Sequence, residues 1–200
     1  MNVLSNIPFV IVGLMGIVIV GHIIMEWENV IILLSYLTFF AGLFLTGFGS
    51  AWYHLKPTNE TLVWDRLPMT IAFAGFFCSV VSELVNPIAG IILLIPLLLL
   101  GFFSVVYWIW TERRGRGDLR LYVLVQFLPM LLIPMIMVMY DAPEGYIPYI
   151  VALLIFYLIA KVFELFDSVI YSWRHFISGH TLKHLIAAVG AFCLLLLLQG

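Results

Sequence analysis

The chain has 200 residues, of which 64% are hydrophobic and only 10% are charged. A soluble domain is about half apolar and about a quarter charged, so this chain lacks the polar side chains that a water-exposed globule needs. Its formal net charge of −2 excludes a basic nucleic-acid-binding protein. Its two cysteines, both inside apolar runs, exclude a disulfide framework and a cysteine-rich zinc site. The composition predicts an integral membrane protein.

Apolar stretches long enough to cross the hydrocarbon layer as helices, about 20 residues each, occur repeatedly along the chain. The seven stretches cover about residues 4–24, 30–54, 66–83, 88–110, 119–140, 146–171 and 179–198. The polar segments between them are all short, and the first runs from Glu26 to Asn29. We therefore expect a single all-α domain over residues 1–200, a bundle of seven transmembrane helices in which successive spans are antiparallel.

Seven spans divide the charged side chains between the two faces of the membrane. The face that holds residue 1 receives Lys56, Arg66, Arg113, Arg114, Arg116, Arg120, Arg174 and Lys183. The opposite face receives Glu26, Glu28, Glu83, Asp141 and Glu144, and no Lys or Arg. Because Lys and Arg gather in cytoplasmic loops, this division predicts a cytoplasmic amino terminus and a carboxyl terminus outside.

One lysine, Lys161, lies within the sixth predicted span and does not follow this division. It shares that span with Glu164 and Asp167, at spacings that place the three on one helix face. We predict an ion-pair ladder that faces the inside of the bundle, because charges at membrane depth need partners. An alternative is that the two carboxylates line a route to a metal.

Three histidines fall at the face where residue 1 lies. His54 ends the second predicted span, and His180 and His184 begin the seventh. Positions four apart lie one above the other on a helix, which lets one helix present two imidazoles to one metal ion. Three histidine ligands with one open position are the arrangement of a catalytic zinc site. The alternative for the pair is two interfacial histidines without a ligand.

A serine and an aspartate are predicted at the same depth. Ser50 precedes His54 by four positions and shares its helix face, and Asp65 opens the third predicted span, where the helix dipole favours a carboxylate. Each has a structural alternative: Ser50 could bond to the carbonyl of Thr46, and Asp65 could be a helix N-cap. A haem held by two histidines would leave Asp65 and one histidine without a role.

These residues lie in segments that resemble a known family. Gly49 to His54, read Gly-Ser-Ala-Trp-Tyr-His, and Asp65 to Met69, read Asp-Arg-Leu-Pro-Met, resemble the paired signature of the alkaline ceramidases. The family has glutamate where this chain has Arg66. His180 to His184 resembles the seventh-helix HxxxH of the same superfamily, which also contains the adiponectin and progestin receptors and the Per1 lipid-remodelling proteins. Asn2 to Pro8 is similar to the start of the ceramidase first helix.

The resemblance implies a zinc ion held by His54, His180 and His184, with Ser50 and Asp65 contacting the zinc-bound water. Zinc lowers the pKa of bound water to about 7. Asp65 would take a proton from that water and Ser50 would stabilise an oxyanion. The expected function is intramembrane, zinc-dependent hydrolysis of the amide bond of a ceramide-like lipid that enters from the bilayer. The alternative is a receptor-like or lipid-sensing protein with a structural zinc and little turnover.

Overall fold

The computed structural model describes residues 1–26, 30–174 and 177–199, and every regular element in them is a helix. The elements are η1 (Leu4–Asn6), α1 (Ile7–Glu26), α2 (Val30–Leu55), α3 (Asn59–Leu84), α4 (Pro87–Glu112), α5 (Arg120–Met139), α6 (Tyr146–Leu165), α7 (Asp167–Arg174) and α8 (Gly179–Leu197). Among the described residues, seven of these helices are long and apolar enough to cross a membrane, which confirms the predicted all-α membrane bundle. The predicted boundary from Glu26 to Asn29 falls on residues 27–29, outside the described residues.

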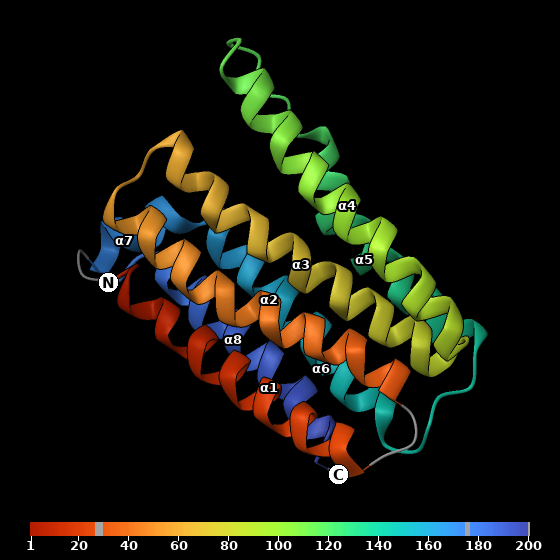
Figure 1. Ribbon diagram of the computed structural model, residues 1–200. Coiled ribbons are helices and arrows are strands. Elements are labelled where there is room, and N and C mark those ends of the chain that lie inside the picture. The colour runs from red at the N-terminus through yellow and green to blue at the C-terminus, as the bar shows by residue number, and fades with distance from the viewer. Residues whose placement is uncertain (27–29, 175–176, 200) are drawn as a thin grey trace.

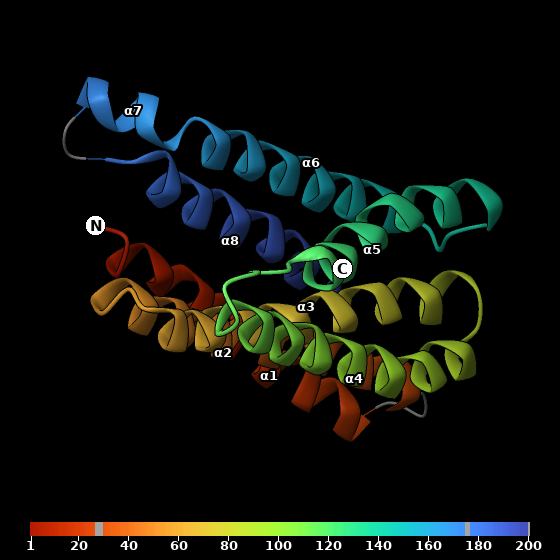
Figure 2. The same ribbon diagram turned by 90° about the horizontal axis from the view of Figure 1, so that it is seen from above.

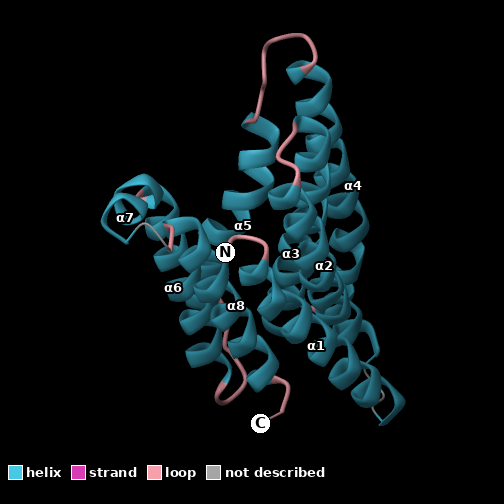
Figure 3. Ribbon diagram, turned by 90° about the vertical axis from the view of Figure 1, so that its left-hand side faces the viewer, coloured by secondary structure: helices cyan, strands magenta, loops and turns pink. Residues whose placement is uncertain are grey.

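The long helices run side by side, and the two chain termini lie at opposite ends of the bundle (Figure 1). The amino terminus lies at the same end as α7 and the α2–α3 connection. Helix α2 packs against α1 and α3, α3 packs against α4 and α5, and α6 packs against α8 (Figures 2 and 3). The end that holds the amino terminus therefore also gathers the end of α2 and the start of α8.

Helix α3 begins earlier than its apolar stretch. The prediction of 66–83 was wrong at its start, because α3 covers Asn59–Leu84. Thr58 and Thr61 form a capping box, in which each side chain accepts a backbone N–H of the other residue, and this cap fixes the first turn in the polar segment. Asp65 therefore lies about 9 Å inside the helix, and its interpretation as an N-cap or helix-opening residue was wrong.

The sixth predicted span is also corrected. The expected helix over 146–171 is divided at Phe166 into α6, which ends at Leu165, and α7, which begins at Asp167. The Asp167 carboxylate accepts a hydrogen bond from the backbone N–H of His180, at 2.6 Å. This bond satisfies one of the unpaired donors in the first turn of α8. Asp167 thus supports the start of α8 and does not belong to the predicted ion-pair ladder.

Helices α2 and α3 approach each other at backbone distance near the amino-terminal end of the bundle. A Cβ atom at Gly49 would overlap the carbonyl oxygen of Trp64 on α3. Small residues permit such close helix contacts in membranes. The contact lies one residue before Ser50 on α2 and one residue before Asp65 on α3, so it brings these two side chains to the same level of the bundle.

Candidate metal centre

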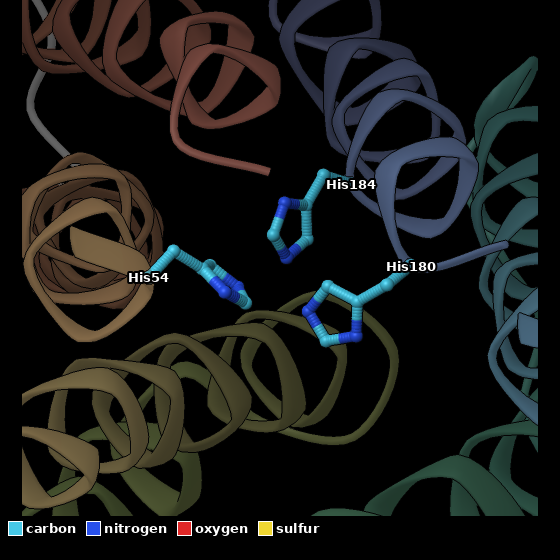
Figure 4. Close-up of side chains that lie close together, drawn as sticks. All are labelled: His54, His180 and His184. Atoms are coloured by element: carbon cyan, nitrogen blue, oxygen red, sulfur yellow. The ribbon is translucent and has the colours of Figure 1, made fainter. Parts of the chain in front are cut away.

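The three predicted histidines converge from two helices. His54 lies in the last turn of α2, and His180 and His184 lie in the first two turns of α8. Figure 4 shows their rings pointing toward one another. One ligand nitrogen from each lies within 4.8 Å of those of the other two, and the ring centroids are separated by 4.6 to 5.3 Å. The structure confirms the predicted cluster, which is an arrangement that could hold a metal ion.

The hydrogen bonding of His54 fits a metal ligand. Its Nε2 atom is buried and has no hydrogen-bond partner among the described residues. Leaving a buried polar atom unpaired costs about 1–3 kcal/mol. A metal ion at the centre of the cluster would satisfy it, since neutral imidazole nitrogen is a preferred ligand of zinc and related metals. Within the described ranges, no other set of three His, Cys, Asp or Glu side chains is close enough to hold an ion.

His184 is oriented by a residue from the amino-terminal turn. Its Nδ1 lies 2.9 Å from the Ser5 hydroxyl oxygen, and the same hydroxyl lies 3.0 Å from the Asn2 carbonyl oxygen. A carbonyl can only accept, so we assign the serine proton to Asn2 and the proton between Ser5 and His184 to Nδ1. This tautomer leaves the lone pair on Nε2 of His184. Metal-binding histidines are commonly held in this way.

The amino-terminal turn also holds the start of α8. The Asn2 side-chain oxygen accepts hydrogen bonds from the hydroxyls of Thr181 at 2.6 Å and Ser178 at 3.2 Å. Ser178 is in turn the N-cap of α8, where it accepts the N–H of Thr181. Asn2 and Ser5 therefore bind Ser178, Thr181 and His184, which follow one another at intervals of three positions from the N-cap of α8 into its second turn. The sequence did not reveal this role, although it singled out Asn2 to Pro8 as a segment similar to the ceramidase first helix.

Ser50 and Asp65 lie beside the histidine cluster in one cavity. Both line it together with His184. The buried Ser50 hydroxyl is near the Asp65 carboxyl but has no hydrogen bond of good geometry in the part of the chain that the structure describes. The alternative of a bond from Ser50 to Thr46 was wrong. Thr46 itself donates to the Gly42 carbonyl, at 2.8 Å.

The cavity has a volume of about 130 Å³ and is mostly apolar. From Ser50 and Asp65 it continues along α2 and α3 to Phe39 and Phe76. Eleven helical residues correspond to about 16 Å, which is about half the thickness of the hydrocarbon layer. A polar, histidine-bearing end and an apolar interior suit a molecule with a polar group and a long hydrocarbon tail.

Two lysines line the same cavity. Lys161 and Lys183 each bind one oxygen of the Glu164 carboxylate, at 2.7 and 2.6 Å. The predicted ion pair between Lys161 and Glu164 is confirmed. The third member of the ion-pair cluster is Lys183 and not the expected Asp167. From the sequence, Lys183 was expected only among the charges at the membrane face. No sequence pattern indicates this difference, because it depends on α6 packing against α8.

No protein-family model, curated protein or solved structure matches this chain. What the protein does must be inferred from these residues and their surroundings.

Proposed function

We propose that this protein is an intramembrane zinc-dependent hydrolase that cleaves the amide bond of ceramide-like lipids. The observation that carries the proposal is the placement of a serine and an aspartate beside a three-histidine cluster, at the polar end of an apolar cavity. The resemblance of these same positions to the alkaline ceramidase motifs supports the reaction class. A structural metal alone would not require a carboxylate and a hydroxyl that share a cavity with it.

Zinc is the metal that suits this ligand set best. Three imidazoles with a fourth, open position are the ligand set of catalytic zinc, whereas a bis-histidine haem uses only two. His54, His180 and His184 would hold the ion. When bound, zinc lowers the pKa of a coordinated water to about 7 and polarises a carbonyl oxygen.

Asp65 and Ser50 supply the remaining chemistry. Asp65 accepts a proton from the attacking water while the water oxygen bonds to the amide carbon. The Ser50 hydroxyl donates a hydrogen bond to the oxyanion that forms on the former carbonyl oxygen. Asp65 then returns the proton to the amide nitrogen as the carbon–nitrogen bond breaks. The products are a fatty acid and an amine. Water is consumed and no oxidant or other co-reactant is needed.

The cavity and its surroundings support a lipid substrate. An acyl chain would lie in the apolar part of the cavity, which extends from Ser50 and Asp65 toward Phe39 and Phe76. Helix α6 packs on α8 and not extensively on α5, although residues of α5 and α6 both line the cavity. A hydrogen bond from Gln126 to Tyr157, at 3.0 Å, links the two helices. We propose that the lipid enters from the bilayer between α5 and α6.

The division of Lys and Arg between the two membrane faces supports a site that faces the cytoplasm. Lys56 follows the end of α2, Lys183 lies in the first two turns of α8, and Arg113 follows the end of α4, where Glu112 bonds to Asn59 at the start of α3. We propose a cytoplasmic amino terminus and a carboxyl terminus outside, on the rule that Lys and Arg gather in cytoplasmic loops.

The proposal is tested with purified full-length protein, stripped of metal and then reloaded with zinc. It is incubated with a panel of neutral and anionic N-acyl lipids that includes ceramides, and fatty acid release is measured by mass spectrometry. We expect release from at least one lipid amide that disappears on stripping and returns with zinc. Retention of zinc with no release from any lipid would contradict the proposal and favour the receptor-like alternative.

A further inference from the structure

The cavity contains a charged cluster that the proposed reaction does not use. Three residues, Lys161, Glu164 and Lys183, form what we name the lysine cluster, in which one carboxylate makes two ion pairs. The pair with Lys161 lies within α6, and the pair with Lys183 joins α6 to α8. Both Glu164 oxygens are engaged, one by each ammonium group. Two positive charges share one negative charge, so the cluster carries a net charge of +1.

The two lysines face the cavity and the glutamate does not. Lys161 and Lys183 both belong to its lining, whereas Glu164 is not among the described lining residues. The lysine side chains are 24% and 17% exposed. Each ammonium carries three N–H donors, and Glu164 takes one from each. The cationic side of the cluster is therefore presented to whatever occupies the cavity.

The cluster lies at the polar end of the cavity. Lys183 is adjacent in sequence to His184, in the first two turns of α8, and Lys161 lies in the last two turns of α6. Asp65 is the only other charged side chain in the described lining. In the proposed function its carboxylate interacts with the attacking water and is not the partner of the lysines. An excess positive charge in a low-dielectric site is costly, so it is expected to meet an anion.

We propose that the lysine cluster binds an anionic headgroup, so that the substrate is an N-acyl lipid that carries a carboxylate or phosphate on the amine side of its amide. This inference rests on the proposed function, which places the acyl chain in the apolar part of the cavity and the amide beside the histidines. The headgroup then lies at the end of the cavity where Lys161 and Lys183 are. Lysine is a common ligand of phosphate and carboxylate groups.

Binding without turnover tests the inference. Three hexadecanesulfonyl amides, of glycine, phosphoethanolamine and ethanolamine, share one tail and a sulfonamide bond that resists hydrolysis. The first carries a carboxylate, the second a phosphate, and the third is neutral. Their affinities for the zinc-loaded full chain in detergent are measured by displacement of a fluorescent fatty-acyl probe. We expect at least one anionic ligand to bind roughly tenfold more tightly than the neutral one, because partly buried charges interact strongly.

Two variants separate headgroup binding from a purely structural ion pair. In Lys161→Gln/Lys183→Gln the preference for anions is expected to fall to about unity. In Glu164→Gln, which keeps both cations and removes their counter-charge, it is expected to be maintained or to rise. If the lysine variant fails to fold, the preference for anionic ligands in the wild type and in Glu164→Gln still tests the inference. Equal binding of all three ligands by the wild type, or a loss of preference in Glu164→Gln, would overturn the inference. Fatty acid release is measured separately, so a failure of the headgroup inference is distinguished from a failure of the proposed hydrolysis.

Discussion

The Ser5 hydroxyl and the Nδ1 atom of His184 lie 2.9 Å apart in the interior of the protein, although 179 positions separate them in the sequence. The bond joins the turn before α1 to the helix that supplies two of the three histidines. It fixes which ring nitrogen of His184 carries the proton and which way the ring faces. Partners of this kind hold a metal-binding histidine in the tautomer and orientation that the metal requires.

Replacing Ser5 is therefore expected to weaken metal binding. In Ser5→Ala the His184 ring loses its partner, and zinc affinity measured by chelator competition is expected to fall about 10- to 100-fold. Ser79→Ala is the matched control, because Ser79 is also buried but its hydroxyl bonds to the Phe76 carbonyl in its own helix. Equal affinity in Ser5→Ala and wild type would show that the bond does not orient the ligand.

Asp65→Asn is expected to abolish hydrolysis and to keep zinc. The amide keeps the shape of the side chain but cannot accept the proton of water, and loss of a general base costs about 10²- to 10⁴-fold in rate. Fatty acid release and zinc content are measured on the same sample. Glu83→Gln serves as control on the same helix, where Glu83 bonds to the Tyr36 hydroxyl near the opposite end. Undiminished release by Asp65→Asn would refute its role as base.

The close contact between α2 and α3 predicts a steric effect at Gly49. In Gly49→Ala the new methyl group meets the Trp64 carbonyl, so the helices must separate, at an expected cost of about 1–3 kcal/mol. The thermal midpoint in detergent is measured by tryptophan fluorescence. Gly21→Ala is the control, because no atom lies within 4 Å of a Cβ built there. Similar midpoints for the two variants would show that the contact does not limit helix packing.

The proposed orientation predicts where the carboxyl terminus lies. Alkaline phosphatase fused after Gly200 is active only when it leaves the cytoplasm of a bacterial host, so we expect an active fusion. A green fluorescent protein at the same point is expected to stay dark. A fluorescent, phosphatase-negative pair would place the histidine cluster at the outer face.

Most of the fold followed from the length and apolarity of the spans, because a helix that crosses lipid must satisfy its own backbone. The two helix boundaries that differed depend on local polar contacts. Thr58 and Thr61 start α3 before its apolar stretch, and Asp167 at the start of α7 accepts a hydrogen bond from the first turn of α8. A hydropathy profile detects neither a helix cap nor a hydrogen bond between helices.

The three-histidine cluster was predictable from the sequence, but the residues that contact it and its cavity were not. His180 and His184 share a helix face by their spacing, and the number of spans places His54 at the same end. Ser5 and Lys183 gained their roles only when the amino-terminal turn and α6 packed against α8. Their partners lie far away in the sequence, so no local pattern marks them.

The most direct test of the three-histidine centre is elemental analysis of purified protein. We predict one zinc ion per chain in the wild type after zinc loading and dialysis, and almost none in the His180→Ala/His184→Ala variant prepared in parallel. Circular dichroism of both samples shows whether the variant keeps its helices. Equal zinc in the two proteins, or none in the folded wild type, would contradict a metal site at His54, His180 and His184.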